Sequence, residues 1–257
     1  MIFSAKVVEK TYIRSSFHTF FLILHFDCKK SVMKKILYSQ FDKAKIAEMP
    51  VVSFPGRIVV IQSVGEAERA VSYLLSQPIL GVDTETRPSF RRGESHKVSL
   101  LQVSSKEICF LFRLNMIGIT PAIKQLLENT EVPMIGISWH DDILSLKRRA
   151  AFVPGRFIDL QNVVGDIGIK DMSLQKIYAN IFHKKISKRQ RLTNWDADVL
   201  NDKQKQYAAI DAWSCIQLYE EIERLKQNND FELVVVHIPE PLVMQTETKL
   251  TNESNDI

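Results

Sequence analysis

The sequence has few cysteines, and they lie far apart. Cys28, Cys109 and Cys215 are the only three, and no two of them form a Cys-x-x-Cys pair. Neither a zinc site nor a disulfide framework is therefore indicated. We interpret the three residues as free thiols in a reducing compartment, and we expect a cytoplasmic protein.

The sequence also lacks a hydrophobic run long enough to cross a bilayer. Its most apolar stretch, residues 17–26 (FHTFFLILHF), is far shorter than the ~20 residues that a spanning helix needs. Basic residues precede it, as in a signal peptide, but His18 and His25 interrupt it and no small-x-small cleavage site follows. Because Met33 opens a stretch typical of a protein start (MKKILYSQF), we interpret residues 1–32 as an over-extended N-terminus that is not native. No membrane association is expected.

Composition favours one globular domain. The 257 residues are 45% hydrophobic and 25% charged, which are ordinary values for a soluble protein. No internal repeat is present. The formal net charge of +4 is compatible with a polyanionic partner but does not establish one.

Hydrophobic patterning predicts a β-rich first half followed by helices. Short β-branched or apolar runs predict strands at residues 57–62, 79–83, 97–103, 107–112 and 133–138. Apolar residues at helical spacing predict helices at residues 66–76, 121–128, 173–182 and 202–225, with a further helix opening near residue 142. Strands become scarce beyond residue 149. This order predicts an α/β fold, a mixed sheet with antiparallel edge strands and flanking helices.

These elements divide the chain into four parts. After the N-terminal extension, a lead-in segment covers residues 33–56 and the main domain covers residues 57–228. Residues 229–257 form a C-terminal extension, partly disordered, because residues 245–257 are polar and lack periodicity.

A first pair of acids lies at the end of a predicted strand. Asp83 and Glu85 follow the apolar run 79–82 in the sequence GVDTET. Residues i and i+2 of a strand point the same way, so the two carboxylates share one face. They repel each other unless a cation lies between them, and Mg²⁺ or Mn²⁺ suits such oxygen ligands. Asp-x-Glu alone is common, so a solvated acid pair is the alternative interpretation.

A second acidic feature is GISWHDDILSLKRR at residues 136–149. Here a strand ends and a helix begins, which places Asp141 and Asp142 near the helix start. Acids at this position are also good helix caps, so capping is the alternative to metal binding.

The third feature is QYAAIDAW at residues 206–213, on a predicted helix. Tyr207 and Asp211 are four residues apart and share a helix face. A phenol one turn from a carboxylate is suited to holding a water against a metal. The alternative is a simple Tyr–Asp pair on a half-buried helix.

Together, the three features resemble the DEDD superfamily of 3′–5′ exonucleases, in its tyrosine-bearing DEDDy branch. The resemblance covers about residues 58–225, and residues 173–213 are similar to the ribonuclease D and Werner-type group. It implies a ribonuclease H-like fold. It also implies an enzyme that hydrolyses phosphodiester bonds at the 3′ end of DNA or RNA with two divalent cations, Mg²⁺ or Mn²⁺, releasing nucleoside 5′-monophosphates.

The resemblance also implies roles for particular residues. Asp83, Glu85 and Asp211 match the acids that ligate the two metals, and Tyr207 matches the tyrosine that orients the attacking water. Asp142 matches the aspartate of the second motif, which precedes a leucine by four positions, as here; Asp141 is its rival.

Candidate substrate contacts lie beside the acidic motifs. The cations form two clusters, Lys184, Lys185, Lys188, Arg189 and Arg191 before the third motif and Arg87, Arg91 and Arg92 after the first. Such clusters suit a polyanion, although a solvated surface is the alternative. The terminal nucleotide is expected to contact Thr84, Leu101 or Gln102.

One departure from the family pattern is visible. The ribonuclease D and Werner-type group has Trp-x-x-Arg-Pro-Leu where this chain continues from Trp195 with DADVL. This puts substrate contacts in doubt but leaves the metal site intact. We expect Trp195 to pack in the core, with base stacking as the alternative.

Two other functions stay open. One is a ribonuclease D-like enzyme that trims RNA 3′ ends, since nothing in the sequence separates RNA from DNA. The other, of a different class, is an inert domain that binds nucleic acid or protein. The presence of all four acids and the tyrosine argues against the inert domain.

Overall fold

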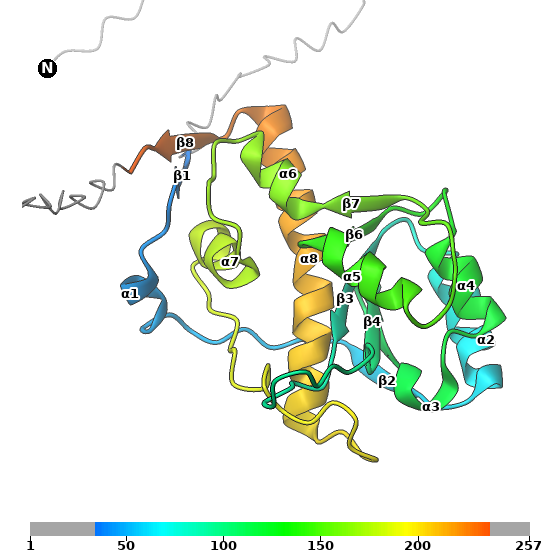
Figure 1. Ribbon diagram of the computed structural model, residues 1–257. Helices are drawn as coiled ribbons and strands as arrows, with labels where there is room; N and C mark the ends of the chain where they lie inside the picture. Colours follow the sequence, from blue (N-terminus) through cyan, green and yellow to red (C-terminus); the bar gives the residue numbers. More distant parts are fainter. Residues whose placement is uncertain (1–33, 237–257) are drawn as a thin grey trace, which may run out of the picture. The chain divides into compact units, whose positions relative to one another are not determined.

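The computed structural model describes residues 34–236. A six-stranded sheet with the strand order β2-β5-β4-β3-β6-β7 forms its centre (Figure 1). Its strands are β2 (Arg57–Ile61), β3 (Leu80–Glu85), β4 (Leu100–Ser104), β5 (Ile108–Arg113), β6 (Met134–Gly136) and β7 (Phe157–Asp159). The predicted α/β fold with a mixed sheet and flanking helices is confirmed.

The single antiparallel strand of this sheet lies elsewhere than expected. β4 runs antiparallel to both β3 and β5, whereas the β2–β5, β3–β6 and β6–β7 pairs are parallel. The antiparallel strand is therefore inside the sheet and not at its edge. The reason is that β4 and β5 form the expected hairpin, and β2, from earlier in the chain, then pairs with the free side of β5.

Helices cover both faces of the sheet (Figure 1). On one face lie α6 (Leu160–Gly165), α7 (Leu174–Phe182) and the long α8 (Asp202–Asn228). On the other lie α2 (Val64–Leu74), α4 (Pro121–Leu127) and α5 (Trp139–Lys147). Each face has its own hydrophobic core. α8 packs across β3, β4 and β5, so it is the helix that lies closest to the centre of the sheet.

The helices α2, α4 and α8 begin where the sequence supplies a cap. Ser63 and Glu66 form a reciprocal capping box at the start of α2, and Asn201 and Gln204 form another at the start of α8. α4 has Thr120 as its N-cap and a proline in its first turn. These caps pair backbone N–H groups that have no partner within the helix.

A second, two-stranded sheet was not predicted. β1 (Lys35–Tyr38) pairs in parallel with β8 (Phe231–Val234), so the two ends of the described chain lie side by side. Each strand has only four residues. No local pattern announces a pairing between segments so far apart in sequence. Four short elements were also missed: β7, α1 (Lys43–Ile46), α3 (Leu114–Ile117) and α6. Each is too short for a hydrophobic pattern to be recognised in its sequence.

Cys109 of β5 and Cys215 of α8 are free and buried in the core between the sheet and α8. Within residues 34–236, no helix is long and apolar enough to cross a membrane. The predictions made for residues 1–32, for Cys28 and for residues 245–257 fall outside the described part of the chain.

Candidate active site

Asp83 and Glu85 lie in the last three residues of β3, on the face that packs against α8. The approach of α8 is close at Gly81, two residues earlier on the same face. A Cβ added at Gly81 would lie 2.0 Å from the carbonyl oxygen of Ala212 on α8. Glycine therefore allows the helix backbone to approach the strand, and this approach brings Asp211 next to the two acids of β3.

Asp83, Glu85 and Asp211 form one group. A carboxylate oxygen from each lies within 4.8 Å of the others. Asp211 and Glu85 are almost fully buried, with 6% and 8% exposure. Three carboxylates at this spacing, two of them buried and Asp83 partly buried, are suited to a divalent cation that prefers oxygen ligands.

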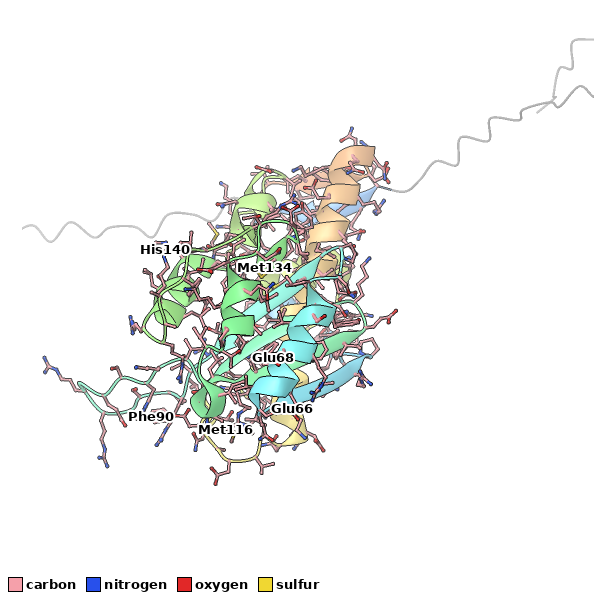
Figure 2. The ribbon with its side chains drawn as sticks, turned by 90° about the vertical axis from the view of Figure 1, so that its right-hand side faces the viewer. Glu66, Glu68, Phe90, Met116, Met134 and His140 are labelled. Carbon is pink, nitrogen blue, oxygen red and sulfur yellow. The ribbon has the colours of Figure 1, made fainter. Side chains whose placement is uncertain are left out.

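The second-motif acid approaches from the other side of the sheet. Asp142 lies in the first turn of α5, and its Oδ1 accepts a hydrogen bond from the hydroxyl of Thr84 on β3. Asp141, its neighbour, is exposed. The geometry thus favours Asp142 over Asp141, although Asp142 lies outside the closest group of three acids. His140, also in this turn, projects outward from α5 (Figure 2).

An unusual backbone turn sets the start of α5. Ser138 has a left-handed conformation with φ of 58°, which is uncommon for a residue other than glycine. The Asp159 carboxylate accepts the N–H groups of Ser138 and Trp139 at 3.1 and 3.0 Å. Asp159 was not singled out from the sequence. An acid at the end of a short, unrecognised strand gives no local signal for this role.

The carboxyl groups raise one another's pKa. Burial, followed by the charges of Asp211 and Asp142, holds the pKa of Asp83 well above its usual value. Burial and then Asp83 and Asp211 raise the pKa of Glu85 to about 10. Burial raises the pKa of Asp211 to about 7 and that of Asp142 to about 6, although Tyr207 and Thr84 respectively oppose the shift by donating hydrogen bonds. Without a cation the group therefore retains protons near neutral pH, and a bound cation would displace them.

Tyr207 lies one helical turn before Asp211 and is 9% exposed. Burial and the charges of Asp211 and Glu85 raise its pKa, so the phenol keeps its proton. Trp195 is fully buried and packs against the Tyr207 ring, with 6.0 Å between ring centroids. The expectation that Trp195 packs in the core is confirmed.

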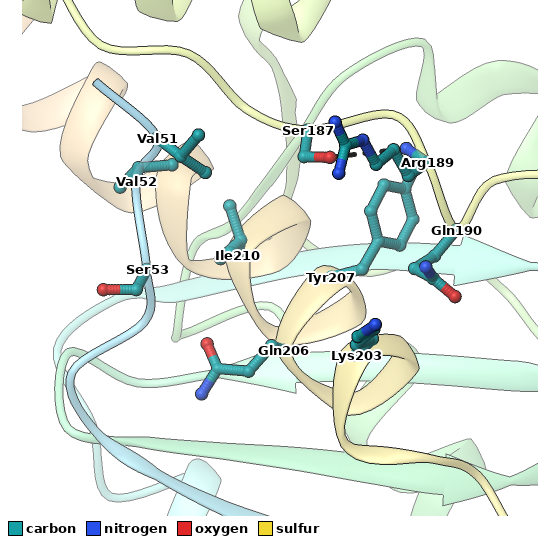
Figure 3. Close-up of a pocket in the computed structure, with 10 residues that line it drawn as sticks. All are labelled: Val51, Val52, Ser53, Ser187, Arg189, Gln190, Lys203, Gln206, Tyr207 and Ile210. Carbon is teal, nitrogen blue, oxygen red and sulfur yellow. Dashed lines mark hydrogen bonds between the residues drawn. The ribbon is translucent and has the colours of Figure 1, made fainter.

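Two of the predicted cations lie near the acids. The charge of Arg191 lowers the pKa of Glu85, against the larger effects of burial and the neighbouring acids. Burial, Arg191 and Lys43 lower the pKa of Lys188, and the nearby Asp211 opposes this shift. Arg189 instead lines a cavity beside Tyr207 (Figure 3).

The second basic cluster lies on the exposed loop between β3 and β4. Arg87 and Arg91 border a hollow that this loop shares with Leu192 and Asn194. Phe90 projects from the same loop and is 80% exposed (Figure 2). The loop is anchored beside Glu85, because the N–H of Ser99 donates to the Glu85 carbonyl at 2.8 Å.

Two predicted substrate contacts need correction. Leu101 and Gln102 have no exposed surface. Leu101 is paired with Thr84 in the β3–β4 register, so it faces the α2 and α4 side and packs in that core. Gln102 is paired with Asp83 and lies beneath α8. Neither side chain is open to a nucleotide, whereas Thr84 is partly buried and holds Asp142.

The strand order and the group of acids at the end of β3 are those expected of a ribonuclease H-like nuclease domain. The sequence model of the family described as 3′–5′ exonuclease matches residues 58–226. The chain belongs to this 3′–5′ exonuclease family.

Relatives and solved structures agree with this assignment. The chain is 27% identical over 187 residues to the bifunctional 3′–5′ exonuclease/ATP-dependent helicase WRN of Mus musculus, an alignment that covers 69% of this chain and 13% of that protein. It is 25% identical over 214 residues to a 3′–5′ exonuclease of Arabidopsis thaliana, covering 76% of this chain and 74% of the relative. The chain thus spans only a small part of the length of WRN, but most of the length of the Arabidopsis thaliana relative.

Two solved structures share the fold. The EXO domain of Nibbler from Aedes aegypti superposes with a TM-score of 0.64 at 17% identity, covering 71% of this chain and 95% of that one. Ribonuclease D of Trypanosoma brucei in complex with RNA U12 superposes with a TM-score of 0.57 at 18% identity, covering 68% of this chain and 70% of that one.

Proposed function

We propose that this protein is a 3′–5′ exonuclease that hydrolyses phosphodiester bonds at the 3′ end of DNA or RNA and releases nucleoside 5′-monophosphates. The observation that carries the proposal is the convergence of Asp83, Glu85 and Asp211 within 4.8 Å. Tyr207 and Asp142 lie beside them, in a chain that belongs to an exonuclease family.

The three clustered acids fit divalent metal, because they offer only oxygen ligands and repel one another without a cation. We assign Asp83, Glu85 and Asp211 as ligands and Asp142 as the support of a second site, with two Mg²⁺ or Mn²⁺ ions. When bound, such ions would activate a water and neutralise charge on the phosphate.

The remaining steps fall to side chains of this chain. Tyr207 keeps its proton, so its hydroxyl can position the attacking water by a hydrogen bond. Lys188 and Arg191 supply positive charge next to the acids, where they can contact the substrate phosphates. No side chain described above is assigned to recognise the sugar 2′-OH that distinguishes RNA from DNA, so DNA and RNA are both candidate substrates.

The second candidate is a ribonuclease D-like enzyme that trims RNA. The fold similarity to a ribonuclease D solved with RNA U12 supports it, whereas the sequence similarity to the 3′–5′ exonuclease/helicase WRN supports a 3′–5′ exonuclease and does not point to RNA. A catalytically inert binding domain would not need the four acids Asp83, Glu85, Asp142 and Asp211 together.

The test is digestion of oligonucleotides labelled at either end, as DNA and as RNA, with Mg²⁺ or Mn²⁺. We expect stepwise shortening from the 3′ end that is lost in Asp83→Ala and Asp142→Ala and strongly reduced in Tyr207→Phe. Asp141→Ala is the matched control, because it removes an exposed acid from the same turn and should keep full activity. Equal activity in Asp83→Ala and the wild type would refute the proposal. Loss in Asp141→Ala with retention in Asp142→Ala would exchange the roles of the two aspartates.

A further inference from the structure

A cavity of about 370 Å³ opens beside Tyr207 (Figure 3). Its floor is one side of α8, formed by Lys203, Gln206, Tyr207 and Ile210. One wall is formed by Val51–Ser53 of the lead-in segment. The other wall is formed by Ser187, Arg189 and Gln190, which lie in the stretch that carries the basic cluster before α8. The volume is within the range of pockets that hold small organic groups.

The cavity adjoins the candidate active site through Tyr207. Tyr207 lines the cavity and is also the residue one helical turn from Asp211. Lys188, which lies near Asp211, is in the same short segment as Arg189 at the cavity wall. Tyr207 thus joins the cavity to the acids, so a strand whose phosphate lies at the acids can extend toward this opening.

The lead-in wall is firmly attached although it precedes the matched family region, which starts at residue 58. The N–H of Val52 donates to the carbonyl of Lys185 at 3.0 Å, and the N–H of Lys185 donates to the carbonyl of Pro50 at 2.9 Å. Gln206 on α8 accepts the N–H of Phe54 at 3.2 Å. The segment thus forms part of the site and does not merely lead into it.

The chemistry of the lining fits a nucleobase. Val51, Ile210 and the Tyr207 ring provide apolar surface for the face of a base, and Val51 leaves 60% of its surface exposed. Ser53, Ser187 and Gln190 offer hydrogen-bonding groups for the base edge. Arg189 and Lys203 supply positive charge for the adjoining phosphates.

Given the proposed function, we propose that this cavity binds one base of the substrate strand close to the bond that is cut. The lead-in residues Val51–Ser53 then take part in substrate binding, which the family region alone would not provide. The base faces Val51 and Ile210, and the phosphates on either side of this nucleotide contact Arg189 and Lys203.

The test is binding of a fluorescent single strand to the whole protein with Ca²⁺ in place of Mg²⁺. A series of strands carries one abasic site at the first, second, third or fourth position from the 3′ end. In the wild type we expect one position to weaken binding about fivefold or more, as loss of a stacked base does. In Val51→Glu and in the milder Val51→Ala, the penalty at that position should disappear or shrink while intact strands bind less tightly.

Val153→Glu is the matched control. Val153 is 74% exposed and follows Phe152, which packs in the core on the opposite face of the sheet. It should bind like the wild type at every abasic position. No position-specific penalty in the wild type, or the same penalty in both Val51 variants, would overturn the inference. So would tighter binding of intact strands by Val51→Glu, because a carboxylate added to a cavity that holds a nucleotide should weaken binding.

The two proposals fail in distinguishable ways. A wild-type protein that binds strands with a position-specific penalty but shortens none refutes the exonuclease function and keeps the base site. A protein that shortens strands from the 3′ end but shows no penalty refutes only the base site.

Discussion

The hydroxyl of Thr84 donates a hydrogen bond to the carboxylate of Asp142. The two residues belong to the first and second acidic motifs and approach from different elements, β3 and α5. Thr84 alternates with Asp83 and Glu85 along the strand and points to the opposite face. Thr84, which lies between the proposed metal ligands Asp83 and Glu85, thus fixes the position of Asp142 on the other side of the sheet.

We expect Thr84→Val to lower kcat about tenfold or more, since a hydrogen bond to a charged group contributes about 1.5–3 kcal/mol. KM should change little. Because this hydrogen bond lowers the pKa of Asp142, its loss should also move the acidic limb of the pH–rate profile to higher pH. Steady-state kinetics across pH are the measurement. Thr84→Ser retains the hydroxyl and should behave like the wild type. A Val variant with the wild-type profile would contradict the assigned role.

The metal-free protein should lose stability as the pH rises. The folded-state pKa is about 6 for Asp142 and about 7 for Asp211, above the ordinary value of 3.8. Glu85, with a folded-state pKa of about 10 against an ordinary value of 4.5, extends this difference to higher pH. The folded state therefore holds more protons than the unfolded state between about pH 4 and 10, so the free energy of unfolding falls across that window. We expect Tm to fall by about 5 °C or more over this range.

Divalent cation should reverse this loss. Mn²⁺ or Mg²⁺ binds the ionised acids, so the stabilisation it provides should grow between pH 5 and 8. Thermal denaturation with and without cation measures both effects. Asp211→Asn should flatten the pH dependence and weaken the stabilisation by cation. A Tm that rises with pH in the metal-free wild type would contradict the raised pKa values.

Part of this site follows from sequence and part does not. Strand alternation places Asp83 and Glu85 together, and helical spacing places Tyr207 with Asp211, because both are local rules. The exclusion of Leu101 and Gln102 depends on which face each residue of β4 takes, and that depends on its register with β3. The wall at Val51 and the pairing of β1 with β8 depend on contacts between distant segments, which no local pattern encodes.

Gly81 should be intolerant of any side chain. Its added Cβ would lie 2.0 Å from the Ala212 carbonyl oxygen, a backbone atom that cannot move without α8. We expect Gly81→Ala to lower the free energy of unfolding by about 1–3 kcal/mol and to impair catalysis by displacing Asp211. Urea denaturation and activity are the measurements.

Gly65 provides the matched control for this substitution. It lies in α2, and the nearest atom to its added Cβ is the flexible end of Arg69 at 3.6 Å. Gly65→Ala should keep activity and equal or exceed the wild-type stability, because alanine favours a helix more than glycine does. Equal stability of both variants would show that α8 does not depend on close approach at Gly81.

Asp159 should position Asp142 without touching substrate. Its carboxylate holds the N–H groups of Ser138 and Trp139, and it fixes the left-handed turn from which α5 starts. We expect Asp159→Ala to lower kcat and to weaken Mn²⁺ binding measured by calorimetry about tenfold, since the two hydrogen bonds that fix this turn are lost, together with the N-cap hydrogen bond from Gln161 of α6. Adding Ser138→Gly to this variant should restore part of both, because glycine adopts the left-handed conformation without strain. Failure of that rescue, with Mn²⁺ affinity unchanged in Asp159→Ala, would mean that Asp159 stabilises the fold but does not set the position of Asp142.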